Sequence, residues 1–218
     1  MILINGEFPG PLLELTEGDD VVVEVSNGLD DESAIHFHGE PLRETHPPSS
    51  SPTHTPPGIE MIDTPWSDGT PGLSQRPIPP GESFTYRWKA AQYGSYWYHS
   101  HSHEQVEDGC YGPVAILPRA DTPKPFGLIS NRDAAIGAME RAEQEAKTVI
   151  MSDHRHVSGH TAWELTQRAR FDPACWDSIL VNGKGRVHCM ERGEAEALLS
   201  EDQREMLAEL NATMTDKG

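Results

Sequence analysis

The segment Gly94-Ser95-Tyr96-Trp97-Tyr98-His99-Ser100-His101 decides the fold of this chain. A glycine opens the segment and three aromatic residues follow, which is typical of a β-strand that starts at a turn. Residues two apart on a strand point to the same face, so His99 and His101 share a face if the strand reaches them. The segment Ile35-His36-Phe37-His38-Gly39 carries the same kind of pair. Two such pairs on adjacent strands would bring four imidazoles together.

Further strands are predicted on both sides of these segments. Val21-Val22-Val23-Glu24-Val25 is β-branched and lies between two turn sequences. Ser83-Phe84-Thr85-Tyr86-Arg87-Trp88 alternates, so its aromatic residues share one face. Gly112-Pro113 precedes another apolar run, Val114-Ala115-Ile116-Leu117. Short strands with Gly and Pro turns and no helix between them predict a mainly β domain, either a sandwich or a Greek-key barrel.

Composition divides the chain into parts. The first domain is predicted over residues 1–118, with an insert at residues 40–57 that holds six prolines and almost nothing apolar, as a disordered loop does. Residues 119–147 are predicted as a linker with a helix over 131–146. Residues 148–218 are predicted as the start of a second, truncated β domain. In this second part we expect a strand at 148–151, another at 177–183, and helices over 161–170 and 194–210.

The composition argues against several classes of partner. The 218-residue chain has 35 acidic and 17 basic residues, and it has no cluster of Lys and Arg that would neutralise phosphates, so nucleic acid is not expected. No apolar stretch approaches the roughly 20 residues of a membrane span. Residues 1–6 are typical of a strand and turn, so a signal peptide is not expected in this chain. Three cysteines, Cys110, Cys175 and Cys189, allow at most one disulfide.

The histidine pairs are candidates for a metal site. Imidazole suits copper and zinc, and copper heads the stability order among divalent first-row ions. Trp97 and Tyr98 are expected to shield the second pair from water. A single His-x-His is weak evidence, but two pairs that each end a β segment in one domain carry more. From the spacing alone, a metal centre and a purely structural role both stay open.

The residues around the pairs resemble the amino-terminal domain of multicopper oxidases of the laccase and ascorbate oxidase kind. The similar segments follow the family's order and are residues 4–11, 18–19, 35–39, 64–69, 75–81, 94–101, 108–109 and 111–113. The resemblance covers nearly all of residues 2–118. Weaker similarity at residues 152–153 and 177–185 extends to the start of the second domain in filamentous-fungal members.

The resemblance implies a cupredoxin-like fold, a copper cofactor and a role for each of five residues. His36 would bind the type 2 copper of a trinuclear cluster, and His38, His99 and His101 would bind the type 3 pair. Asp68 matches a carboxylate that helps to supply protons during oxygen reduction, a task that suits a carboxylate. A turn residue is the alternative interpretation of Asp68. The implied reaction is one-electron oxidation of phenol-like substrates coupled to reduction of O2 to water, in a secreted protein.

The chain also lacks features of the resembled family. It carries half of the family's cluster ligands, and the His-Cys-His motif of the type 1 copper does not occur in it. The pair His188-Cys189 does not match that motif, so we interpret Cys189 as structural, with Cys175 as its candidate partner. A third cupredoxin domain would be needed to close the cluster. The chain alone is therefore expected to be inactive, and the reducing substrate is not identified, because substrate contacts in the family surround the type 1 site.

The remaining features leave alternatives open. His154, His156 and His160 are interpreted as surface or capping residues, while His46 and His54 lie in the insert and His103 follows the second pair. Removing residues 40–57 restores the family's usual spacing, so we expect a translated intron there, which the genomic sequence tests. Three interpretations compete: a laccase-like oxidoreductase seen as a partial chain, a non-catalytic cupredoxin module that binds copper or zinc, and a truncated fragment without function.

Overall fold

The computed structural model describes residues 1–38, 59, 61, 63–102, 104–170, 176–186, 192–201, 204 and 208. The chain divides into two compact units, Met1–Ile150 and Met151–Gly218. Several predictions fall outside the described residues: the insert at 40–57 with His46 and His54, and also His103, His188, Cys175 and Cys189.

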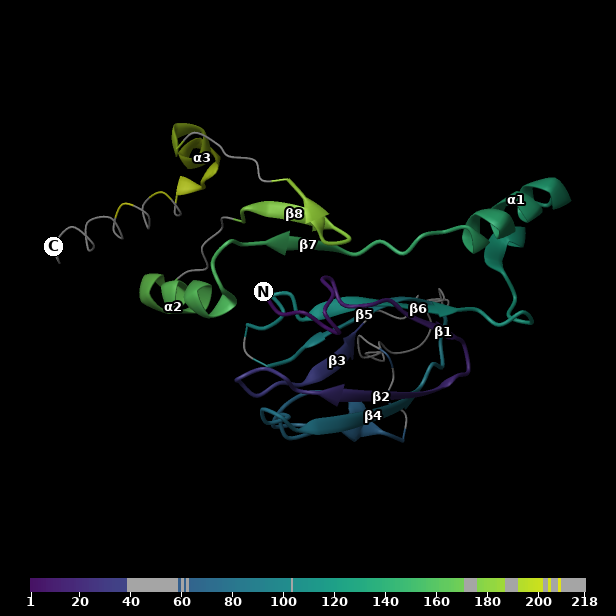
Figure 1. The fold of residues 1–218 in the computed structure, drawn as a ribbon. Coiled ribbons are helices and arrows are strands. Elements are labelled where there is room, and N and C mark those ends of the chain that lie inside the picture. The colour runs from purple at the N-terminus through teal and green to yellow at the C-terminus, as the bar shows by residue number, and fades with distance from the viewer. Residues whose placement is uncertain are drawn as a thin grey trace, which may run out of the picture. The chain divides into compact units, whose positions relative to one another are not determined.

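The first unit contains two separate sheets. The larger sheet has the order β1-β6-β5-β3, formed by β1 (Leu13–Thr16), β6 (Tyr111–Leu117), β5 (Gly94–Ser100) and β3 (Ile35–His38). In the smaller sheet, β2 (Asp20–Ser26) pairs antiparallel with β4 (Ser83–Lys89), and Figure 1 shows this pair alongside the larger sheet. The mainly β prediction is confirmed. Of the two architectures expected, the described strands form a sandwich, because they make two sheets and no closed barrel.

The core of this sandwich is aromatic and lies where the two sheets face each other. Phe37 of β3 packs on Tyr86 and Trp88 of β4, with ring centroids 5.6 and 5.2 Å apart. All three side chains are buried, and burial of each contributes about 1.5–3 kcal/mol. Because neighbours on a strand point to opposite faces, burying Phe37 directs His36 and His38 to the other face of the sheet.

The first unit also contains short helices. A 3-10 helix, η1 (Pro65–Ser67), precedes Asp68, and a second, η2 (Pro125–Leu128), lies near α1 (Asp133–Gln144). The α1 helix falls within the range predicted as helical, 131–146. No helix among the described residues is long and apolar enough to cross a membrane.

The second unit contains a small antiparallel sheet of β7 (Met151–His154), β8 (Ser178–Val181) and β9 (Lys184–Gly185). Its helices are α2 (Gly159–Ala169) and α3 (Arg192–Leu198). The strand predicted at 148–151 was placed too early, because pairing with β8 begins only at Met151; ladder partners override β-branched propensity.

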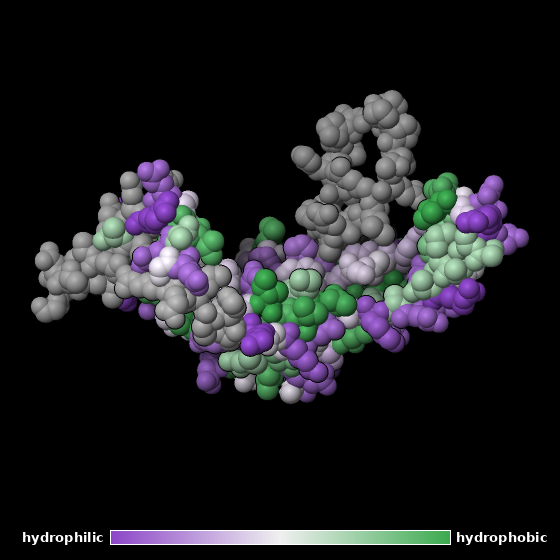
Figure 2. Space-filling view, turned by 90° about the horizontal axis from the view of Figure 1, so that it is seen from above, coloured by the Kyte–Doolittle hydropathy of each residue, from purple (hydrophilic) through white to green (hydrophobic). Residues whose placement is uncertain are grey.

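Large apolar side chains of this small sheet remain exposed, among them Met151, Ile179 and Val181. Figure 2 shows the surface of the whole chain from one side, with green hydrophobic residues gathered in patches between purple hydrophilic ones. Apolar atoms make up more than half of the surface of an ordinary folded protein, so exposed apolar residues by themselves identify no partner.

Candidate metal centre

The antiparallel pairing of β3 with β5 places the two histidine pairs next to each other. The register sets His36 opposite His99. His101 follows the end of β5, and its backbone N–H donates to the carbonyl of Ala34, 2.9 Å away. The His36 ring centroid lies 5.2 Å from that of His38, 5.4 Å from that of His99 and 5.7 Å from that of His101. The structure therefore brings together all four histidines that the sequence singled out.

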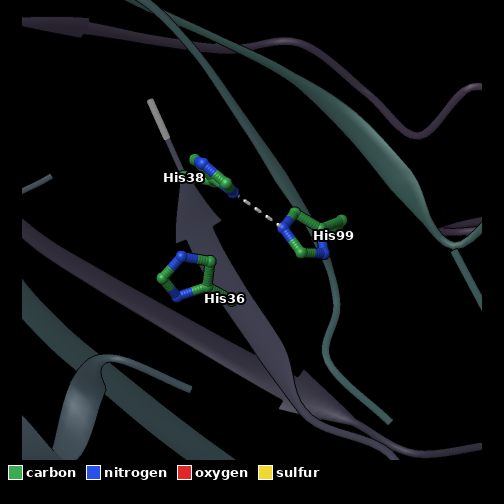
Figure 3. A group of neighbouring side chains, drawn as sticks. All are labelled: His36, His38 and His99. Carbon is green, nitrogen blue, oxygen red and sulfur yellow. Dashed lines mark hydrogen bonds between the residues drawn. The ribbon is translucent and has the colours of Figure 1, made fainter. Parts of the chain in front are cut away.

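Three of the four rings form a tighter group, shown in Figure 3. One nitrogen from each of His36, His38 and His99 lies within 4.8 Å of the other two. His101 lies outside this tight group, with its ring stacked on His99 at a centroid distance of 6.2 Å and its surface exposed to solvent. Within the described residues this is the one group of three or more potential ligands that meets this distance.

His99 offers its Nε2 lone pair to this group. Its Nδ1 donates a hydrogen bond to the carbonyl of Ser100, 2.8 Å away, because a carbonyl oxygen can only accept. Burial lowers the pKa of His99 to about 4; the bond to Ser100 opposes this shift, and His36, His38 and His101 add to it. The ring is therefore neutral at neutral pH, and its Nε2 is an acceptor.

The Nε2 of His99 lies 3.3 Å from the Nδ1 of His38. In the absence of a cation, a hydrogen bond between these nitrogens needs a proton on His38, since His99 carries its proton on Nδ1. Neutral imidazole nitrogens that converge in this way form the kind of donor set that binds Zn²⁺ and Cu²⁺. The residues present thus fit a metal ion of this class.

Asp68, the residue that follows η1, contacts the ring of His36. The Nδ1 of His36 donates to the backbone carbonyl of Asp68 at 2.5 Å and lies 3.6 Å from its Oδ1. The Asp68 carboxylate also accepts a hydrogen bond from the hydroxyl of Thr70, 2.7 Å away. A bond to one ring nitrogen fixes the orientation of the ring and leaves Nε2 as the ligand atom, as partners of metal-bound histidines commonly do.

The loop can reach His36 because the next residue is a glycine. Gly69 has φ of +81°, and a Cβ atom there would lie 1.9 Å from the carbonyl oxygen of Ile35. Ser67, fully buried, accepts a hydrogen bond from the backbone N–H of Arg87 at 2.8 Å, which ties the loop to β4. Asp68 therefore lies in a loop that packs directly against β3, in addition to forming a turn.

Comparison with known proteins supplies the family. A family model described as multicopper oxidase matches residues 1–57 and 50–121. The chain belongs to the multicopper oxidase family. All four histidines and Asp68 lie within the matched residues, and the family resemblance predicted from the sequence is confirmed. The family is one of copper-binding oxidoreductases.

Two similar relatives of this multicopper oxidase chain come from fungi. It is 41% identical over 218 residues to laccase abr2 of Aspergillus fumigatus, which is 100% of this chain and 33% of the relative. It is 42% identical over 221 residues to multicopper oxidase MCE of Talaromyces pinophilus, again 100% and 33%. The crystal structure of a laccase from Botrytis aclada matches 87% of this chain and 28% of its own, with 27% identity and a TM-score of 0.60. The chain spans about a third of the length of these curated relatives.

One of the two aromatic residues expected to shield the site does so. In this multicopper oxidase chain, the Trp97 ring stacks on His99 at a centroid distance of 4.1 Å and on His38 at 5.4 Å. For Tyr98 the prediction was wrong. Strand alternation turns its side chain to the opposite face, where it is buried and its hydroxyl donates to the carbonyl of Pro11 at 2.8 Å.

Sequence reasoning missed a buried glutamine behind the histidines. The Gln105 Oε1 accepts hydrogen bonds from the hydroxyls of Ser33 and Ser100, at 2.8 and 2.7 Å, and its Nε2 donates to the carbonyl of Glu32 at 2.8 Å. Gln105 and both serines are buried. No spacing rule links positions 33, 100 and 105, because folding alone brings them together.

The remaining candidates are not members of this group of ligands. The rings of His154 and His156 are 6.0 Å apart, and the backbone N–H of His156 donates to Asp177 at 2.6 Å. Neither belongs to a group of three potential ligands among the described residues. Cys110 is a free, buried thiol, and burial raises its pKa to about 11, so it stays protonated and does not act as a thiolate ligand at neutral pH.

Proposed function

We propose that this chain supplies the first half of the trinuclear copper site of a laccase-like multicopper oxidase. His36 is the type 2 copper ligand, and His38, His99 and His101 are type 3 ligands. The observation that carries the proposal is the convergence of His38 Nδ1 and His99 Nε2 at 3.3 Å, with a nitrogen of His36 in the same group. An all-imidazole donor set favours copper among the divalent first-row ions.

Copper bound at the complete site would supply one-electron redox chemistry, coupling the oxidation of a phenol-like substrate to the reduction of O2 to water. The chain's own residues hold His36 and His99 in the tautomer that leaves Nε2 free to bind a metal. The Ser100 carbonyl keeps the proton of His99 on Nδ1, and the Asp68 carbonyl does the same for His36. Trp97 covers the flank of the site and limits the approach of water to His38 and His99.

Asp68 is proposed as the group that delivers protons to the site. Its Oδ1 lies 3.6 Å from His36 Nδ1, and its side chain is 37% exposed. A carboxylate that touches both a ligand and solvent can take a proton from water and hold it beside the reacting oxygen. The hydroxyl of Thr70 fixes the other carboxylate oxygen by its hydrogen bond.

The complete reaction requires residues beyond those found here. The His-Cys-His motif is absent from the 218 residues, so this chain offers no entry point for electrons. We propose that a third cupredoxin domain closes the cluster and carries the type 1 copper. The second candidate function is a cupredoxin module that binds copper without turnover, which the same convergent nitrogens of His36, His38 and His99 would support. Secretion and the identity of the reductant stay predictions of the resemblance.

A copper titration of the 218-residue chain tests the proposal. We expect Cu(II) to bind weakly and to give an imidazole-type electron paramagnetic resonance spectrum, with no blue absorption band and no O2 uptake with a phenol. Replacing His36 and His38 by Ala, or His99 and His101 by Ala, abolishes this binding. The matched control replaces a His-x-His pair of the second unit, His154 and His156, and leaves the binding unchanged.

Three outcomes would count against this proposal. A blue colour with O2 uptake would contradict the half-site, because the chain would then complete a turnover by itself. Copper binding that survives loss of both histidine pairs would place the metal elsewhere. Tighter binding of zinc than of copper would favour the non-catalytic module.

A further inference from the structure

We infer that Gln105 is a positioning residue that fixes the two histidine pairs relative to each other. The inference rests on the proposed copper site and adds to it a residue that touches no metal ligand. Gln105 is 7% exposed, and its side-chain amide joins the segment that enters β3 to the segment between His99 and His101. A single amide thus bridges the strands that carry the two pairs.

The path from Gln105 to His99 has two steps. The Ser100 hydroxyl donates to Gln105 at 2.7 Å, and the Ser100 backbone N–H donates to the carbonyl of Cys110 at 2.8 Å. These two bonds fix the Ser100 residue, whose carbonyl in turn accepts the Nδ1 proton of His99 at 2.8 Å. The orientation of the His99 ring, and hence the direction of its Nε2 lone pair, is therefore set through Ser100.

The path to the other strand runs through Ser33. Its hydroxyl donates to the same Gln105 oxygen at 2.8 Å, and the Gln105 Nε2 donates to the carbonyl of Glu32. The carbonyl of Ala34, the residue after Ser33, accepts a hydrogen bond from the backbone N–H of His101 at 2.9 Å. The segment that leads into His36 is thus tied both to Gln105 and to His101.

The network lies on the face of the sheet opposite to the histidines. Ser100 alternates with His99 and His101 along the strand, and the register places Ser100 opposite Ile35, whose side chain is buried. A network on this face can shift the ligands without contacting the metal. Outer partners of this kind change metal affinity by about 10- to 100-fold when they are mutated.

The test compares Gln105→Leu with the parent chain. The substitution removes three hydrogen bonds and leaves the buried Ser33 hydroxyl without its acceptor, while the Ser100 hydroxyl keeps its bonds with the Ser102 backbone, so we expect a loss of stability. At a temperature where both proteins are folded, we expect Cu(II) affinity, measured by chelator competition, to fall by about tenfold. In the metal-free protein, the ring ¹⁵N chemical shifts of His99 change from one Nδ1–H tautomer to a mixture of both.

Two further variants separate positioning from stability. The double variant Ser33→Ala, Gln105→Leu removes the unpaired Ser33 hydroxyl and keeps the bond from the Ser102 backbone N–H to the Ser100 hydroxyl at 3.1 Å. Its stability should therefore return toward that of the parent chain, while its Cu(II) affinity stays low. Asn27→Leu is the matched control. Asn27 is also a buried amide with three hydrogen bonds, to Asp31, Ile78 and Leu29. It does not contact Gln105 and is linked to Ser33 only through the Ile78 backbone, whose carbonyl also accepts the Ser33 N–H. It should lose stability without a change in Cu(II) affinity or in the His99 tautomer.

The inference is overturned if Gln105→Leu keeps the parent affinity and a single His99 tautomer despite lower stability, because Gln105 would then only support the fold. If the parent chain does not bind Cu(II), the proposed function fails, and the metal-free tautomer of His99 still decides the role of Gln105.

Discussion

At the scale of single residues, His99 links the site to the stability of the protein. Burial lowers the pKa of His99 to about 4, against about 6.5 in an unfolded chain. The unfolded chain therefore takes up a proton between these values while the folded chain does not. The contribution of His99 is unchanged above about pH 6.5, and it reduces the free energy of unfolding as the pH falls toward 4.

We predict that His99→Gln flattens this pH dependence. In the metal-free parent protein, uptake of a proton by His99 on unfolding lowers the free energy of unfolding by up to a few kcal/mol as the pH falls from about 6.5 to about 4. Gln has no titratable group, so the variant loses less stability between neutral and acid pH than the parent chain does. Urea denaturation at a series of pH values in the presence of a chelator measures the difference. Equal slopes for the two proteins would contradict the assigned pKa direction.

Gly69 gives a second prediction at this scale. In Gly69→Ala, the new methyl group would lie 1.9 Å from the Ile35 carbonyl, and the residue would keep a φ of +81°. The left-handed backbone alone costs about 1–2 kcal/mol, and the clash adds to it. Gly72→Ala is the control, because Gly72 has φ of +80° and nothing within 4 Å of a Cβ atom. Gly69→Ala should therefore be the less stable and should weaken Cu(II) binding by displacing Asp68. If the two variants lose the same amount of stability, the loop that contains Gly69 can move away from Ile35 without cost, and the prediction is wrong.

At the scale of elements, Tyr86 of β4 holds β3 in place. Its hydroxyl accepts the backbone N–H of Ile35 at 2.9 Å, and the side chain is fully buried. Because β3 lies at one edge of the larger sheet among the described strands, this bond satisfies an N–H that points away from β5, the strand paired with β3. The small sheet thereby supports the strand that carries His36 and His38.

We predict that Tyr86→Phe loosens β3 while the core stays packed. The variant leaves the Ile35 N–H unpaired, which costs about 1–3 kcal/mol, and amide hydrogen exchange at Ile35 should accelerate. Tyr96→Phe is the control, since the Tyr96 hydroxyl donates to the carbonyl of Gln92 and neither residue pairs with β3. Unchanged exchange at Ile35 in Tyr86→Phe would show that packing of Phe37 alone positions the strand.

The sequence predicted these elements better than the contacts between them. Alternation in residues 35–38 and 99–101 correctly predicted that the two histidines of each pair share a face, because strand periodicity is local. The same alternation shows why the shielding role predicted for Tyr98 was wrong. Tyr98 is next to His99 in the strand, so its side chain points to the opposite face, into the core. The bonds of Asp68 to His36 and of Gln105 to Ser33 could not be predicted, since each depends on loops brought together by the whole fold.

At the scale of the whole molecule, the two units carry different histidines. The four histidines of the metal centre belong to Met1–Ile150, while His154, His156 and His160 belong to Met151–Gly218. The formal net charge of -18 attracts cations to the chain as a whole. Nonspecific attraction alone would therefore stabilise both units against unfolding, whereas a built site would stabilise only the first.

Copper should accordingly protect one unit and not the other. A ligand that binds only the folded state adds about 2.7 kcal/mol at a concentration 100 times its Kd. Hydrogen exchange on the full chain should therefore slow at β3 and β5 when Cu(II) is added, with no change at β7 and β8, and a chelator should reverse the effect. Mg²⁺ at the same concentration controls for charge, because it prefers oxygen ligands. Equal slowing in both units, or by Mg²⁺ as well, would assign the effect to the acidic surface, and the convergent imidazoles of β3 and β5 would then be structural.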